Sequence, residues 1–201
     1  MSRPARLDID AAILAGGEAR RFGGRDKAAL SIHGRRVLDW QLEILRQVTD
    51  RIVIVGGRPE RFADTGVPVI ADREPALGPL GGISTALHHS TSERTLILAC
   101  DMPFVTAAFL TYLAETGRDC DATMARNKLG VHPLCAAWTT MAGPKVTRLI
   151  DEGVRKMRDA VARLRVHTVE GDALRAFDPD GRLLHNINTP DDYARALALR
   201  G

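Results

Sequence analysis

Residues 11–27 read AAILAGGEARRFGGRDK. An apolar run here leads directly into a loop that holds four glycines, at positions 16, 17, 23 and 24. Glycine tolerates positive φ angles and lets the backbone approach a ligand, so that successive N–H groups can form an anion-binding concavity. The spacing is neither G-x-G-x-x-G nor a Walker A loop, because Lys27 follows Asp26 and precedes Ala28. We therefore predict a phosphate cradle of another kind at the end of a first strand.

The same loop carries concentrated positive charge. Residues 16–36 include six basic residues against two acidic ones, and Arg21, Arg25 and Lys27 lie among the glycines. Reactions at phosphorus need fixed positive charge near the transferred group. Lys27 is one of four lysines in a chain with 28 basic residues, so a compact point charge is favoured there. An ordinary solvated surface turn has a similar composition and is the alternative.

Short β-like runs alternate with longer helical runs along the whole chain. Strands are expected at 11–15, 51–55, 67–71, 95–99, 122–126, 133–137, 165–169 and 184–188. Helices are expected at 37–47, 82–89, 106–115, 143–149, 153–164 and 190–199. This alternation predicts a three-layer α/β/α, Rossmann-like domain with a mostly parallel sheet, spanning 1–201 with an N-terminal tail at 1–9. The ligand is expected beyond the carboxyl ends of the strands.

Two carboxylates follow predicted strands. Asp101 ends the run 95–99 just before Pro103, a position that suits a Mg²⁺ ligand shared with substrate phosphates. Asp72 follows the run 67–71, and the sequence GPLGG at 78–82 then opens a helix whose amino end could receive an anion or a base edge. A solvated turn or a helix cap explains Asp101 equally well, and an ordinary strand-to-helix connection explains the other stretch.

Two amides, Asn186 and Asn188, end the last predicted strand, where they would point to the same face. Asx turns explain such residues equally well. The six histidines show no spacing typical of a metal site. The three cysteines, at 100, 120 and 135, fit neither a disulfide framework nor a zinc site, so we expect reduced thiols.

Composition limits the classes of protein to consider. The chain has 201 residues, is 45% hydrophobic and 26% charged, and carries a net charge of +3, which is typical of one globular core. A basic stripe with interleaved aromatic residues is typical of nucleic-acid binding, and the sequence contains no such stripe. No apolar run approaches the roughly 18 residues that a membrane span needs, and charged residues occupy the place of a signal peptide. We expect a cytoplasmic protein.

Taken together, these motifs resemble those of the molybdenum cofactor guanylyltransferases, the MobA family of nucleotidyltransferases. The matching stretches recur in family order from about residue 11 to residue 195. They are LAGG at 14–17, Arg21, GG at 23–24, DK at 26–27, Asp72, GPLGG at 78–82, CDMP at 100–103, HP at 132–133 and NINTP at 186–190.

The resemblance implies an activity and a set of site residues. The activity is Mg²⁺-dependent transfer of GMP from GTP to the phosphate of molybdopterin or Mo-molybdopterin, with release of pyrophosphate. Transient contacts with cofactor-maturation proteins or molybdoenzymes are also implied. Asp101 would bind the metal, Arg21 and Lys27 would act on the phosphates, and Asn186 and Asn188 would lie near the acceptor. The nucleotide would contact Leu14, Ala15, Gly16, Gly17, Lys27, Val55, Asp72, Gly81 and Asp101.

Several rival functions stay open at this point. A cytidylyltransferase of the same fold would have an alanine in place of Gly16, and a Cβ there would restrict the approach of a purine. Sugar-phosphate nucleotidylyltransfer uses the same glycine loop, lysine and strand-end aspartate. A nucleotide-binding adaptor that delivers the cofactor would need neither the metal carboxylate nor Lys27. The family can also have an asparagine where this chain reads VGG at 55–57, so a contact at Val55 would come from the backbone.

Overall fold

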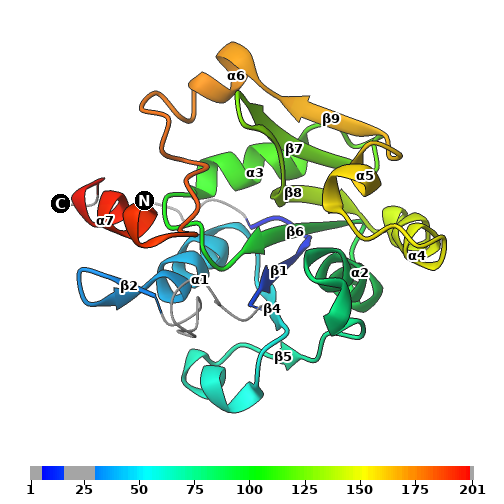
Figure 1. Ribbon diagram of the computed structural model, residues 1–201, viewed down its shortest axis with the longest axis horizontal. Helices are drawn as coiled ribbons and strands as arrows, with labels where there is room; N and C mark the ends of the chain where they lie inside the picture. Colours follow the sequence, from blue (N-terminus) through cyan, green and yellow to red (C-terminus); the bar gives the residue numbers. More distant parts are fainter. Residues whose placement is uncertain (1–5, 16–29, 200–201) are drawn as a thin grey trace.

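The computed structural model describes residues 6–15 and 30–199, and its centre is a twisted sheet (Figure 1). In this part of the chain the sheet has seven strands in the order β5-β4-β1-β6-β8-β7-β9. Their bounds are β1 Asp10–Leu14, β4 Arg51–Val55, β5 Val69–Ile70, β6 Arg94–Ala99, β7 Ala122–Asn127, β8 Gly130–Thr139 and β9 Val166–Val169. Only β8 among these strands runs antiparallel to its neighbours. The predicted mostly parallel α/β fold is confirmed.

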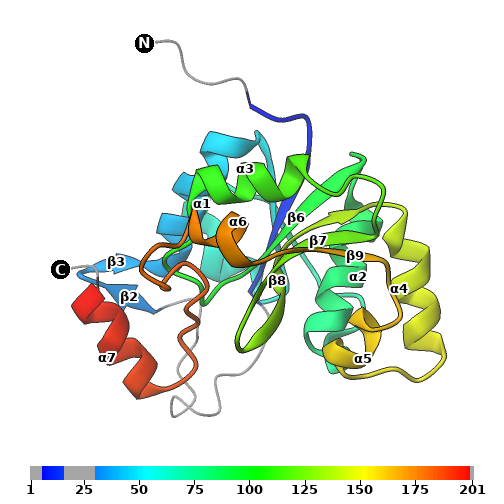
Figure 2. The same cartoon turned by 90° about the horizontal axis from the view of Figure 1, so that it is seen from above.

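Helices cover both faces of the sheet (Figure 2). One face carries α1 (Val37–Val48), α3 (Ala107–Glu115) and α6 (Gly171–Arg175). The other carries α2 (Pro79–His89), α4 (Ala142–Asp151) and α5 (Met157–Val161). Strands β1 and β6 are apolar along nearly their whole length because they are buried between these two layers. After β1 the chain builds β4 and β5 on one side and then β6 on the other, which creates a topological switch point beside β1.

A small unit beside the sheet joins distant parts of the sequence. The hairpin of β2 (Ser31–Ile32) and β3 (Arg35–Arg36) packs against the C-terminal helix α7 (Pro190–Leu199). The Tyr193 hydroxyl donates a hydrogen bond to the Ser31 carbonyl, and Ile32, Ile187 and Ala196 are completely buried between these elements. The packing fixes the chain before α7 close to the carboxyl ends of the strands.

Two predictions of secondary structure, the strand at 184–188 and the helix at 153–164, are wrong. Residues 184–188 form no strand, and Ile187 N–H donates to the Asp101 carbonyl (2.9 Å) instead of joining a ladder. The expected helix 153–164 is only α5, because Gly153 takes a φ of 86° and closes the end of α4. Short elements went unpredicted: the hairpin β2–β3, the 3₁₀ helices η3 (Pro59–Thr65) and η4 (Pro75–Leu77), and α6.

The cysteines and the helices bear on two further expectations. Cys100, Cys120 and Cys135 are free thiols, as expected. Within residues 6–15 and 30–199, none of the helices combines the length and the apolar character needed to cross a membrane.

Candidate active site

A cavity of about 450 Å³ opens at the carboxyl ends of β1, β4 and β6, at the predicted edge of the sheet. We call it the strand-end cavity. Its walls come from these three strand ends, the start of α2, Leu134 of β8 and the chain before α7. Six residues predicted from the sequence line it: Leu14, Val55, Asp72, Asp101, Asn186 and Asn188.

Asp101 lies two residues after the end of β6 and is 7% exposed. Three contacts hold the backbone around it. Cys100 N–H donates to the Leu14 carbonyl (3.2 Å), and Ile187 N–H donates to the Asp101 carbonyl. From α1, the Gln41 amide donates to the carbonyls of residues 99 and 102, on either side of Asp101. The carboxylate therefore sits on a turn that is tied to three separate elements.

Asp72 also lines the cavity, in the segment between β5 and α2. Its Oδ1 accepts hydrogen bonds from the Thr85 hydroxyl of α2 and from the Glu74 N–H, both at 3.0 Å. Thr85 is 3% exposed and also accepts from the Arg73 N–H (3.0 Å). These bonds fix Asp72 to the side of α2, at the edge of the strand-end cavity.

The first turn of α2 lies at the cavity wall. Gly78 caps it with a φ of 58°, Pro79 occupies a first-turn position without needing a partner for an N–H, and Gly82 also lines the cavity. The early N–H groups of a helix have no partner within the helix and favour anions or acceptor atoms. Gly81 faces away from the cavity, because a Cβ there would lie 2.3 Å from the Glu74 carbonyl oxygen. Gly81 is not among the residues that line the cavity, and its predicted contact with the nucleotide stays a prediction.

The end of β4 contributes backbone more than side chain. Val55 is 1% exposed and is followed by two glycines at positive φ, Gly56 (83°) and Gly57 (77°). Gly56 N–H donates to the Ile70 carbonyl, and Ala15 N–H donates to the Val55 carbonyl, both at 2.9 Å. Leu14, the last residue of β1, lines the cavity, whereas Ala15 is buried and is not among the lining residues.

Asn186 and Asn188 come from the irregular chain before α7. Asn186 Oδ1 is buried and makes no hydrogen bond within the described ranges. Beside it, Asp192 Oδ2 accepts from the N–H groups of Asn188 (3.1 Å) and Thr189 (2.9 Å), while Thr189 Oγ1 accepts from the Asp192 N–H (3.1 Å). This reciprocal cap also lowers the pKa of Asp192: burial opposes ionisation, but the hydrogen bonds outweigh it. The cap of α7 thus holds the amide pair in place.

Four predicted residues, Gly16, Gly17, Arg21 and Lys27, lie outside the described residues. On one side of them the described residues end at Ala15. On the other side they begin again at Leu30, just before the β2–β3 hairpin. Their roles stay predictions from the sequence.

Comparison with known proteins assigns the chain to a family. Residues 11–169 match the family described as the MobA-like NTP transferase domain. The chain belongs to this family. A molybdenum cofactor guanylyltransferase of Desulfosudis oleivorans is 33% identical over 187 residues, which cover 92% of this chain and 93% of the relative. Another, from Cereibacter sphaeroides, is 34% identical over 193 residues, covering 93% and 94%.

A solved structure agrees with the sequence relatives. The molybdopterin-guanine dinucleotide biosynthesis protein A of Archaeoglobus fulgidus superposes with a TM-score of 0.81 at 30% identity, covering 95% of this chain and 98% of that chain. The resemblance that the motifs indicated is therefore confirmed, and this member of the MobA-like family is a nucleotidyltransferase.

Carboxylate and amide side chains line the cavity in this MobA-like protein. Asp101 and Asp72 supply carboxylates, and Asn186 supplies a buried carbonyl oxygen without a partner within the described ranges. In the part of the chain that the structure describes, no three His, Cys, Asp or Glu side chains gather as a metal site. Mg²⁺ commonly takes one or two carboxylates together with waters and substrate phosphates. The donor set therefore fits a Mg²⁺ ion that is shared with a nucleotide.

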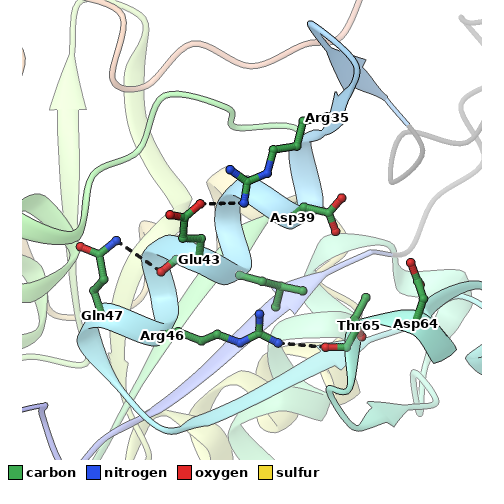
Figure 3. Close-up of a pocket in the computed structure, with 8 residues that line it drawn as sticks. Arg35, Asp39, Glu43, Arg46, Gln47, Asp64 and Thr65 are labelled. Carbon is green, nitrogen blue, oxygen red and sulfur yellow. Dashed lines mark hydrogen bonds and ion pairs between the residues drawn. The ribbon is translucent and has the colours of Figure 1, made fainter.

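A second hollow, of about 430 Å³, lies between α1 and η3 (Figure 3). Its charged side chains already have partners within the protein. Arg35 forms an ion pair with Glu43 (2.6 Å), and Arg46 donates to the Thr65 carbonyl (2.9 Å). Arg36 pairs with Asp39 (2.7 Å) and with Asp64 (2.6 Å). Asp39 and then Asp64 raise the pKa of the guanidinium, and Arg36 lowers the pKa of the Asp64 carboxyl. These contacts join β3, α1 and η3 to one another, which is a structural role.

Proposed function

We propose that this nucleotidyltransferase transfers GMP from GTP to molybdopterin or Mo-molybdopterin and releases pyrophosphate in a Mg²⁺-dependent reaction. The observation that carries the proposal is the strand-end cavity, which brings Asp72, the start of α2, Asp101 and the Asn186–Asn188 segment together. The guanylyltransferase names of the relatives at 33% and 34% identity support the same reaction.

The two walls of the cavity suit two substrates. The nucleotide would lie against Leu14, Val55, Asp72 and the first turn of α2, where backbone groups and small residues permit a close approach. The acceptor phosphate would enter from the side of Asn186 and Asn188, whose amide groups both donate and accept hydrogen bonds. Asp101 also lines the cavity and would hold the metal where the reacting phosphates meet.

The phosphates need positive charge, which the described cavity wall does not supply by itself. Arg21 and Lys27 of the glycine loop, with the backbone of Gly16 and Gly17, would surround the triphosphate and neutralise it. A bound Mg²⁺ held by Asp101 would withdraw charge from the phosphate oxygens during the reaction.

We propose a single displacement as the mechanism. An oxygen of the acceptor phosphate attacks the α-phosphorus of GTP, and the bond to the β-phosphate oxygen breaks, so that pyrophosphate leaves with the electron pair. The described wall offers no Ser, Cys or Lys nucleophile beside a general base: Cys100 is 5% exposed and follows an apolar strand. Inversion at a chirally labelled α-phosphorus supports this mechanism, whereas retention would indicate a covalent enzyme intermediate.

A nucleotide panel tests the reaction itself. The purified chain is incubated with molybdopterin, Mg²⁺ and each of GTP, CTP, ATP and UTP, and the dinucleotide product is identified by its mass. We expect the guanine dinucleotide together with pyrophosphate. A cytosine product would identify the cytidylyltransferase reaction instead, and tight GTP binding without any product would favour the adaptor.

Asp101→Asn tests the metal carboxylate within the same assay. The amide keeps the shape but loses the charge, so we expect turnover to fall by roughly a hundredfold or more at saturating Mg²⁺. Asp119→Asn is the matched control, because Asp119 is an exposed aspartate that does not line the cavity. Equal turnover of the two variants would remove Asp101 from the reaction.

A further inference from the structure

Gln41 is a polar residue on the apolar side of α1. It is completely buried, and the other buried residues of this helix are apolar: Val37, Leu38, Leu42, Leu45 and Val48. It does not line the strand-end cavity. A buried amide is costly unless it forms hydrogen bonds, so its bonds show what it does at this position.

The Gln41 amide bridges two backbone carbonyls. Nε2 donates to the Ala99 carbonyl (2.7 Å) and to the Met102 carbonyl (3.0 Å). Both partners are acceptors only, so the NH₂ end of the amide must face them, and the orientation of the side chain follows from chemistry. Gln41 Oε1 is buried and has no hydrogen-bond partner in the described part of the chain. Both N–H donors of the Gln41 amide thus bond to the turn at residues 99–102, whereas its Oε1 acceptor has no such bond among the described residues.

The bridged carbonyls flank Cys100 and Asp101. They close a tight turn at the end of β6, and the side chain at its centre is the carboxylate of the strand-end cavity. The bonds to Leu14 and Ile187 hold only the two residues inside the turn, whereas Gln41 holds both ends. No other side-chain hydrogen bond to these two carbonyls is found among residues 6–15 and 30–199.

We infer that Gln41 is a positioning residue, which sets the Asp101 carboxylate for a divalent cation bound with the nucleotide. The inference rests on the proposed function, because that function gives Asp101 the metal. Mg²⁺ demands nearly ideal octahedral geometry, so a small displacement of its carboxylate weakens the site. Groups that orient a metal ligand typically contribute 10- to 100-fold to metal affinity. Gln41 acts only through the backbone of the turn and touches neither substrate nor metal.

Gln41→Met tests the inference, because methionine has a similar length and can stay buried but donates no hydrogen bond. The measurement is the Kd of GTP by calorimetry, once with Mg²⁺ and once with EDTA, in the absence of acceptor. The ratio of the two constants gives the contribution of the metal. We expect this ratio to fall by about tenfold in Gln41→Met, with the Kd in EDTA unchanged. Hydrogen exchange should also become faster in the peptide that covers residues 98–104.

Leu45→Val is the matched control on the same helix. Leu45 is completely buried, and its side chain has no group that could form a hydrogen bond to the turn at residues 99–102. This variant therefore loosens the packing of α1 but keeps the Gln41 hydrogen bonds to the carbonyls of residues 99 and 102. It should lower the melting temperature and leave the Mg²⁺ ratio as in the wild type. A parallel fall of the ratio in both variants would show a general packing role and overturn the inference.

Asp101→Asn separates failure of the inference from failure of the proposed function. Loss of the Mg²⁺ ratio in Asp101→Asn with a wild-type ratio in Gln41→Met would overturn the role of Gln41 alone. A wild-type ratio in Asp101→Asn would overturn the metal assignment, and the inference with it. If Gln41→Met does not fold, Gln41→Asn takes its place, because its amide is one methylene too short to bridge both carbonyls.

Discussion

Adjacent glycines in α2 provide a sharp test of how the cavity wall is built. A Cβ at Gly81 would lie 2.3 Å from the Glu74 carbonyl oxygen and 3.2 Å from its carbonyl carbon. A Cβ at Gly82 would meet only the Leu14 side chain, at 3.3 Å from Cδ1. Backbone cannot move aside as a side-chain methyl can. We therefore expect Gly81→Ala and Gly82→Ala to behave differently although the two residues are neighbours in one helix.

The magnitudes follow from two opposing effects. Alanine stabilises a helix by up to about 1 kcal/mol relative to glycine, at both positions. Overpacking typically costs about 1–3 kcal/mol, and the 2.3 Å contact at Gly81 belongs at or above the upper end of that range. Gly81→Ala should therefore lower the free energy of unfolding by roughly 2 kcal/mol, or about 4–8 °C in Tm for a chain of this size. Gly82→Ala should change it by less than about 1 kcal/mol.

The functional effects should differ as well. In Gly81→Ala the strain pushes the segment around Glu74 away from α2, and Asp72 Oδ1 is bonded to both sides of that contact. We expect KM for GTP to rise several-fold, with a smaller change in kcat. Thermal unfolding and steady-state kinetics at varied GTP measure the two effects. Equal Tm values for the two variants, or a Gly81→Ala enzyme with an unchanged KM, would refute this account of the wall.

Three further predictions concern the scaffold. Arg94 is 4% exposed and donates to three backbone carbonyls and a threonine hydroxyl, so Arg94→Met should lower the free energy of unfolding by about 3 kcal/mol in urea titrations while kcat per folded molecule stays unchanged. Burial opposes ionisation of Asp10, but hydrogen bonds from hydroxyl, guanidinium and amide groups lower its pKa overall. Its stabilising effect is present above the usual carboxyl pKa and is lost as pH falls through the lowered value, so Asp10→Asn should be less stable at pH 7 and show a flatter acid dependence in thermal unfolding. Burial raises the pKa of the Cys135 thiol to about 12, so iodoacetamide at pH 8 should label the partly exposed Cys120 and leave Cys135 unmodified in intact-protein mass spectra.

The central strands could be predicted from the sequence because burial on both faces leaves a simple pattern. Strand β4 has the expected bounds, β1 is shifted by one residue at both ends, and β6 begins one residue earlier than expected. Short elements could not be predicted in this way. Strand β5 keeps only Val69–Ile70 of the expected 67–71, since Pro68 has no N–H to donate, and the helix expected at 153–164 fails because Gly153 closes α4.

The site could be predicted in part because parallel strands end at the same edge of a sheet. That rule alone places Asp72 and Asp101 together, and both line the cavity. It says nothing of Gln41, whose partners are 58 and 61 residues away in the chain. The sequence did contain one signal for it, a lone amide on the apolar stripe of an amphipathic helix. Such a residue has to find acceptors in the interior, but only the tertiary structure shows which ones.

The sequence pattern grouped Asn186 with Asn188, and both line the strand-end cavity, although the strand that it predicted does not form. Alternation in a strand was the reason to place both amides on one face, and no strand forms there. The same alternation arises because Ile187 between them is completely buried in the α7 cluster while its N–H donates to the Asp101 carbonyl. Because the Ile187 side chain is buried in the α7 cluster, Asn186 and Asn188 on either side of it line the cavity although no strand forms. That single hydrogen bond also ties the backbone of Asp101, the predicted metal ligand, to the segment predicted to lie near the acceptor.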